Sequence, residues 1–127
     1  MINSIGVDIV QISGMRRLIM QSDGVFVRHT FTEEEMRQSE TSEDPAEYFS
    51  ARLASKEAVF KAIAHYTSEK TFDPRIIETL TENDGSPLVT INEELGKLMD
   101  EAGIAKLHVS LSHDGDYVIA FVIAEKQ

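Results

Sequence analysis

The stretch FSARLASKEAVFKAI, residues 49–63, decides the fold. It consists mainly of good helix formers without glycine or proline, and Pro45 places the start of the expected helix near Ala46. Its large apolar residues recur at spacings of three, four and seven, which predicts one buried stripe. They are Phe49, Leu53, Phe60 and Ile63. Glu57 falls on this stripe, and Lys61 follows one helical turn later.

A carboxylate in a core-facing stripe has to be paired, protonated or bound to a metal. A second unusual carboxylate, Asp8, lies in IGVDIVQI, residues 5–12, whose alternation predicts a strand. Ile5, Val7 and Ile9 would share one face, and Gly6, Asp8 and Val10 the other. Taken alone, Asp8 could simply cap a turn at a strand end. If Asp8 lay beside Glu57, the two negative charges would repel each other, and a hard divalent cation bound by both would remove that repulsion.

Composition limits the classes of function. A chain of 127 residues, 42% hydrophobic and 27% charged, predicts one folded domain. The absence of cysteine excludes disulfides and thiolate metal sites and suits a cytoplasmic location. No apolar run approaches the roughly 20 residues of a membrane span, and MINSIGVDIV lacks the basic region of a signal peptide. A net charge of −10 argues against general nucleic-acid binding.

Further elements are expected on both sides of the central helix. Helices are expected at 13–21, 32–39 and 92–102, and strands at 75–81, 88–91, 106–112 and 117–124, the last two forming a hairpin. Ser13 is the expected cap of the first helix, and Asn92 caps the last, which Gly103 ends. In the segment TEEE, Thr32 and Glu35 form a capping box, so its glutamates are expected to serve helix stability alone.

Two polar features allow either a structural or a functional interpretation. The pair Arg16–Arg17 is a solvated helix face or a docking patch for an acidic partner. The polar residues Ser110, Ser112 and His113 form either a solvated strand end or the lining of a site. Because no glycine-rich phosphate loop is present, any phosphate has to be bound by a metal and by cationic side chains.

Several segments together resemble the holo-acyl-carrier-protein synthases, the small 4′-phosphopantetheinyl transferases. Their pattern is a G-x-D strand followed by a helix with (F/W)-x-x-K-E-(A/S)-x-x-K, which Lys56-Glu57-Ala58 and Lys61 match. Phe31-Thr32-Glu33-Glu34-Glu35, the turn Asn83-Asp84-Gly85 with Pro87, and the strand HVSLSH at 108–113 are similar to further family segments. The resemblance covers nearly the whole chain and implies a single α+β domain, 1–127, with a mainly antiparallel sheet packed with helices.

The resemblance also implies a reaction and a set of residues. Family members use Mg²⁺ to transfer phosphopantetheine from coenzyme A to a serine of an apo acyl carrier protein, in fatty acid biosynthesis for example, and release 3′,5′-ADP. Asp8 and Glu57 would hold the metal, Glu57 would also take the serine proton, and Lys61 would stabilise the phosphates. Arg52, Lys56 and His113 would lie on the nucleotide side. A homotrimer with sites built from two chains is implied as well.

Two positions depart from the family pattern. Ala64-His65-Tyr66 stands where the family usually has Gly-Thr-Gly close to the coenzyme A phosphates, and Gly14 replaces a common basic residue of the first helix. Either His65 or Lys70 supplies phosphate contacts through its side chain, or coenzyme A binding is weakened. Two alternatives to an active transferase therefore stay open. One is a non-catalytic or narrowed homologue; the other is an α+β domain whose Glu57 is only salt-bridged to Lys61.

Overall fold

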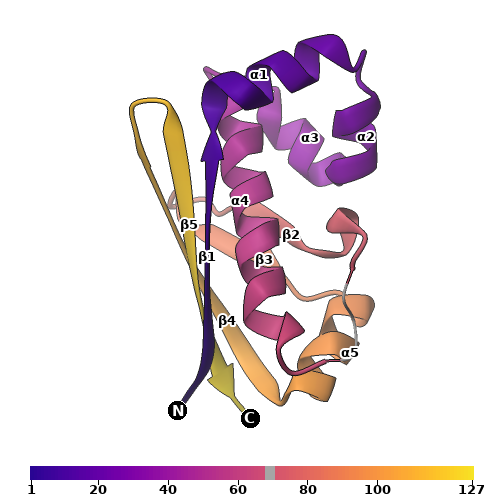
Figure 1. The fold of residues 1–127 in the computed structure, drawn as a ribbon, viewed down its shortest axis with the longest axis vertical. Coiled ribbons are helices and arrows are strands. Elements are labelled where there is room, and N and C mark those ends of the chain that lie inside the picture. Colours follow the sequence, from indigo (N-terminus) through magenta and orange to yellow (C-terminus); the bar gives the residue numbers. More distant parts are fainter. Residues whose placement is uncertain (68–70) are drawn as a thin grey trace.

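The computed structural model describes residues 1–67 and 71–127 and has two antiparallel sheets packed with helices. The larger sheet has the strand order β1 (Ile2–Gln11), β5 (Tyr117–Lys126), β4 (Ile104–Asp114), and the smaller one pairs β2 (Glu78–Thr81) with β3 (Pro87–Thr90). The helices are α1 (Ile12–Gln21), α2 (Val25–Thr30), α3 (Glu33–Ser39), α4 (Pro45–Ala64) and α5 (Glu93–Ala102). In Figure 1, α4 runs along the large sheet, with α1–α3 at one end and α5 at the other. The expected α+β class is confirmed.

Helix α4 is the expected central helix, but it buries a different face. Asp44 caps it by accepting from the Ala46 N–H at 3.2 Å, and Pro45 occupies its first turn. Its most deeply buried row consists of small residues, Ala54, Ala58 and Ala62, all fully buried. Of the predicted stripe, Phe49 and Ile63 are buried, whereas Leu53 and Phe60 are only partly buried. Glu57 therefore lies at the edge of the buried face and not within it.

Gly6 allows β1 to lie against α4. A Cβ atom added at Gly6 would be 2.0 Å from the carbonyl oxygen of Ala58, far inside van der Waals contact. The facing β5 residues are also small or branched and fully or almost fully buried: Val118, Ala120, Val122 and Ala124. Strand and helix are thus closer than ordinary side chains would permit, which brings Asp8, two residues after Gly6, toward the helix.

The other face of the large sheet is exposed and apolar. Ile5, Val7 and Ile9 of β1 are each more than half exposed. In the strand register Val7 is paired with Phe121 and Ile9 with Ile119, and these β5 residues are also exposed. The expected alternation of β1 is therefore correct, but its large apolar residues face away from the core that α4 covers.

A turn distant in sequence caps helix α1. Ser13 was the expected cap, but Gln11 precedes the helix without a side-chain cap, and Ser13 lies inside it. Asp116, in the turn between β4 and β5, accepts from the Ser13 N–H at 3.0 Å and from the Ser13 hydroxyl at 2.5 Å. Its backbone oxygen accepts from the Ile12 N–H at 2.7 Å. The capping carboxylate thus comes from the C-terminal hairpin.

The remaining elements agree with expectation except at two places. The caps of α5 by Asn92 and Gly103, the capping box of α3 and the C-terminal hairpin are confirmed. Helix α2 was not expected. The first two residues of the expected strand 75–81 belong instead to a 3₁₀ turn, Pro74–Ile76, which Asp73 caps by accepting from the Arg75 N–H. In the described ranges, no helix combines the length and apolarity that a bilayer crossing requires.

Candidate active site

Asp8, Glu57 and Lys61 form one cluster where β1 meets α4. Lys61 Nζ donates to Asp8 Oδ1 at 2.9 Å and to the Val7 carbonyl oxygen at 3.0 Å. The Asp8 side chain is 18% exposed, whereas that of Lys61 is 52% exposed, so the cluster opens to solvent on the lysine side. The ion pair joins Lys61 to Asp8 rather than to Glu57, so the interpretation of Glu57 as merely salt-bridged to Lys61 is wrong.

The electrostatics of Glu57 reflect its position between the core and Asp8. Partial burial raises the pKa of its carboxyl, the nearby charge of Asp8 raises the pKa further, and Lys61 lowers it. The ionised form is thus disfavoured but remains accessible to solvent. A carboxylate with a raised pKa is better suited to accept a proton than an ordinary glutamate.

The chemistry of this cluster fits a magnesium ion that is also bound by substrate. Two carboxylates converge there, and Lys61 already provides a positive charge to one of them. Within residues 1–67 and 71–127 no group of three or more acidic or histidine side chains could hold a metal alone. Mg²⁺ is commonly bound by one or two carboxylates together with substrate phosphates, so Asp8 and Glu57 suffice for such a site.

Arg52 and His113 line neighbouring hollows beside the first half of α4. Arg52, 4% exposed, lies 4.5 Å over the Tyr48 ring and donates to the Thr81 hydroxyl. Among the described residues its buried Nε has no hydrogen-bond partner. His113 Nε2 is 3.4 Å from Glu47 Oε1. The hollows, of about 390 Å³ and about 160 Å³, share Glu47 and Ala51 in their linings.

The three polar residues near the end of β4 do not lie on one face of the sheet. Ser110 and Ser112 are paired with the exposed Phe121 and Ile119, so they lie on the outer sheet face. His113 is paired with the buried Val118 and faces the side of α4. Of the two interpretations, the one in which these three residues together line one site is wrong, because strand alternation separates the histidine from the two serines.

Lys56 lies in the core and has a partner that sequence reasoning missed. Its Nζ donates to Glu35 Oε1 at 2.7 Å, and both side chains are 0% exposed. Burial lowers the Lys56 pKa, and Glu35 opposes that shift. Glu35 therefore does more than stabilise its own helix. A signal was available in the sequence, because Lys56 precedes the apolar Val59 by three residues and Ile63 by seven.

The segment after α4 keeps the helix direction for one more residue. His65 is the C-cap in right-handed helical conformation, and Tyr66 donates its hydroxyl to the Asn3 carbonyl oxygen at 3.2 Å. Both side chains are exposed, so His65 is accessible to a ligand. The other candidate for a phosphate contact, Lys70, lies outside the described residues.

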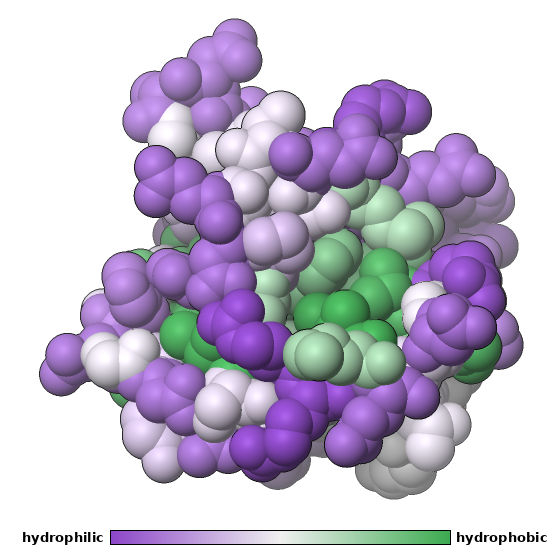
Figure 2. Space-filling view, turned by 90° about the horizontal axis from the view of Figure 1, so that it is seen from above, coloured by the Kyte–Doolittle hydropathy of each residue, from purple (hydrophilic) through white to green (hydrophobic). Residues whose placement is uncertain are grey.

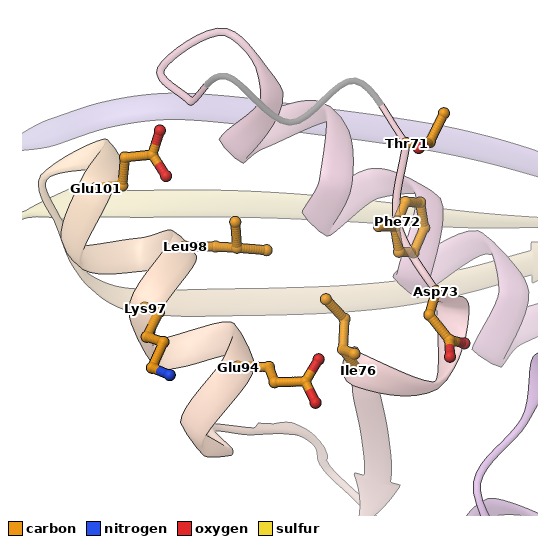
Figure 3. A pocket seen from close by; sticks show the side chains of 8 residues that line it. All are labelled: Thr71, Phe72, Asp73, Ile76, Glu94, Lys97, Leu98 and Glu101. Atoms are coloured by element: carbon orange, nitrogen blue, oxygen red, sulfur yellow. The ribbon is translucent and has the colours of Figure 1, made fainter.

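A further cavity contains none of the predicted site residues. It measures about 460 Å³ and lies between α5 and residues 71–76, as Figure 3 shows. Its lining contains both apolar and polar or charged side chains: Thr71, Phe72, Asp73, Ile76, Glu94, Lys97, Leu98 and Glu101. Neither its position nor its mixed lining connects it with the cluster of Asp8, Glu57 and Lys61.

Comparison with known proteins identifies the family. Residues 4–122 match the model of the 4′-phosphopantetheinyl transferase superfamily. The chain belongs to this superfamily. A transferase relative from Wolbachia pipientis wMel, a holo-[acyl-carrier-protein] synthase, is 36% identical over 97% of the chain and 94% of its own length. The synthase of Geotalea daltonii is 32% identical over 99% of the chain and all of its own length.

Solved structures of the superfamily share the fold. The crystal structure of the synthase from Neisseria meningitidis has a TM-score of 0.88 and 33% identity, covering 99% of this chain and all of its own. The synthase from Helicobacter pylori, solved in complex with coenzyme A, has a TM-score of 0.79 and 26% identity, covering 95% of this chain and 99% of its own. The expected family, fold class and enzyme class are thereby confirmed.

Proposed function

We propose that this chain transfers the 4′-phosphopantetheine group from coenzyme A to a serine hydroxyl of an apo acyl carrier protein and releases 3′,5′-ADP. The observation that supports the proposal most directly is the cluster of Asp8, Glu57 and Lys61 in a chain of this superfamily. Two carboxylates and one solvent-facing cation are the groups that a magnesium-dependent phosphoryl transfer requires. Residues 1–127 would act as one transferase domain.

In this mechanism the side chains act on the serine and on the pyrophosphate. Glu57 accepts the serine proton, directly or through a water, as the serine oxygen bonds to the phosphorus that carries the pantetheine arm. The bond from that phosphorus to the bridging oxygen breaks, and 3′,5′-ADP leaves with it. Asp8 and Glu57 would hold Mg²⁺, which neutralises phosphate charge when bound. Lys61 turns from Asp8 toward the phosphates and stabilises the developing charge.

Arg52 and His113 are the residues proposed for the nucleotide side. The unpartnered Nε of Arg52 and the neighbouring hollows support this assignment. Within the described residues, no hydrogen bond or ion pair joins Arg52 or His113 to the cluster of Asp8, Glu57 and Lys61. A site built from two chains would explain this separation, because the nucleotide side of one chain would then serve the cluster of another. Lys56 is not proposed as a nucleotide contact, because its ammonium group is fully buried and fully hydrogen-bonded within the core.

Transfer is tested by incubating the protein with coenzyme A, Mg²⁺ and apo acyl carrier protein. A mass gain of one phosphopantetheine group on the carrier, dependent on Mg²⁺, is the expected result. The proposal would be contradicted if none of several apo acyl carrier proteins gained this mass while an established synthase modified the same carriers.

The alternative is a homologue that binds coenzyme A or a carrier without turnover, and the replacement of the family's Gly-Thr-Gly turn by Ala64-His65-Tyr66 favours it. Coenzyme A binding measured with and without Mg²⁺ separates the two functions. Strong metal dependence supports an assembled catalytic site, whereas metal-independent binding supports the non-catalytic homologue.

The exposed apolar face of the large sheet supports self-association, and the family resemblance implies a trimer. Ile5, Val7 and Ile9 continue into Ile119 and Phe121 across the strands, which makes one contiguous apolar surface. Burial of this surface between copies would remove it from water. It would also bring residues of a second chain near each site.

Phe121→Asp is therefore expected to convert the assembly to monomers and to lower transfer at least tenfold. The introduced carboxylate would have to be buried unpaired in the interface. Sedimentation equilibrium should give three chain masses for the wild type and one for the variant. The control is Leu88→Asp, which changes another exposed apolar residue, on β3, and should leave the mass unchanged. A wild-type protein that sediments as a monomer would contradict the trimer.

Helix α1 and its neighbour α2 offer the surface proposed for the carrier protein. Figure 2 looks onto this end of the molecule and shows apolar residues in its middle, surrounded by hydrophilic ones. Exposed apolar side chains of the two helices include Leu18, Met20 and Val25. Arg16 is paired with Asp44 at 2.9 Å, so Arg17 is the better candidate to attract an acidic partner.

The cysteine-free composition agrees with the proposed cytoplasmic location.

A further inference from the structure

The buried pair of Lys56 and Glu35 connects α4 to three other segments. Lys56 Nζ has three protons and three acceptors: Glu35 Oε1 at 2.7 Å, the Ile77 carbonyl at 2.6 Å and the Pro74 carbonyl at 3.0 Å. Glu35 in turn accepts from the Thr32 N–H at 3.0 Å and the Thr79 N–H at 3.1 Å. A buried ion pair adds little net stability, but one that is fully hydrogen-bonded can specify a unique arrangement of its elements.

The pair restricts rotation of α4 about its own axis. Lys56 is fixed to α3 and to the start of β2 on one side, while Ala58 lies against Gly6 of β1 on another. Residues 56 and 57 are adjacent on the helix, about 100° apart around its axis. Any rotation that releases Lys56 from its three acceptors therefore turns Glu57 relative to Asp8.

We propose that Lys56, held by Glu35 and two carbonyl groups, is a positioning residue that fixes the direction in which Glu57 faces Asp8. The inference rests on the proposed function, because it assigns Lys56 a role in forming the site for Mg²⁺ and coenzyme A. Lys56 itself contacts neither, because its side chain is fully buried. Its removal should therefore weaken metal binding through Glu57 even in a protein that remains folded.

The test uses a variant in which both charges are removed. In Lys56→Met with Glu35→Gln no unpaired charge is left in the core, and the single glutamine oxygen can still accept from one of the two amides, Thr32 N–H or Thr79 N–H, that the two carboxylate oxygens accept from in the wild type. Binding of Mn²⁺ in the presence of coenzyme A, measured by electron paramagnetic resonance on the full chain, gives a readout independent of activity. The expected result is binding at least tenfold weaker, with transfer partly restored at high metal concentration.

Ser55→Ala is the matched control. It removes the hydrogen bond between Ser55 and Thr79, 2.6 Å long and also buried between α4 and β2, but leaves Lys56 untouched. Its Mn²⁺ affinity should stay within twofold of the wild type. If the double variant does not melt cooperatively, Lys56→Arg is measured instead, because it keeps the charge pair but cannot reproduce the three-acceptor geometry.

Each result decides between two conclusions. A folded variant that binds Mn²⁺ as tightly as the wild type overturns the positioning role, whichever variant is used. A wild-type protein that binds no Mn²⁺ with coenzyme A overturns the proposed function and the inference with it. Weakened binding in the Lys56 variant, with the Ser55→Ala control unchanged, supports both.

Discussion

Glu57→Gln is expected to reduce transfer by roughly 10³-fold or more while raising the melting temperature of the ligand-free protein at pH 7. The activity falls because an amide can neither accept the serine proton nor supply a charged metal ligand. The stability rises because burial and Asp8 both raise the pKa of Glu57, so the ionised side chain is less favourable in the folded state than in the unfolded state.

The same pKa shift fixes the pH dependence of the stability gain. Below the unfolded-state pKa of about 4.3, the carboxyl is protonated in both states, so the variant and the wild type should melt alike. As the pH rises through the folded-state pKa, the wild type loses the stability of the protonated form and the difference grows. Differential scanning calorimetry between pH 4 and pH 7.5 measures it.

Ligand addition should reverse the order of stability. Mg²⁺ with coenzyme A stabilises the wild type through binding to the folded state, but should leave the variant almost unchanged. Glu93→Gln, an exposed glutamate 3.5 Å from Lys97, is the control and should affect neither transfer nor the ligand response. A Glu57→Gln protein that retains transfer would refute both roles assigned to this carboxylate.

The sequence was sufficient for the central helix and for the proximity of Asp8 and Glu57, because the first depends on local pattern and the second on a specific motif. It was insufficient for the face that α4 buries. Periodicity gives most weight to large apolar residues, whereas this helix packs through Ala54, Ala58 and Ala62, whose small size matters only once a partner strand is present.

Long-range pairing explains the other differences. Asp116 caps α1 from a turn 103 residues away, and Glu35 neutralises Lys56 across 21 residues. Neither partner is marked by spacing within its own element. The family resemblance placed Lys56 on the nucleotide side, but lysine can be fully buried when it is paired, and Glu35 provides that partner. The exposed apolar face of β1 likewise requires the sheet order before its orientation can be assigned.

Gly6→Ala is expected to cost at least about 3 kcal/mol of unfolding free energy, enough to leave a marginally stable protein largely unfolded. The new Cβ would be 2.0 Å from the Ala58 carbonyl oxygen and 3.1 Å from the Ala62 nitrogen. Both are backbone atoms, so no side-chain rotation can relieve the overlap, and β1 would have to move away from α4. Urea denaturation followed by circular dichroism measures the loss.

Gly96→Ala distinguishes this steric effect from the general consequences of replacing glycine. Gly96 lies within α5, and a Cβ there would meet only the Ile91 Cγ2 at 3.9 Å, an ordinary contact. That variant should gain about 0.5–1 kcal/mol, because alanine favours the helix. If Gly6→Ala were as stable as the wild type, the strand would not lie against the helix as described. Asp8 would then have no fixed approach to Glu57, because the glycine that admits the strand is also what lets the two carboxylates converge on one site.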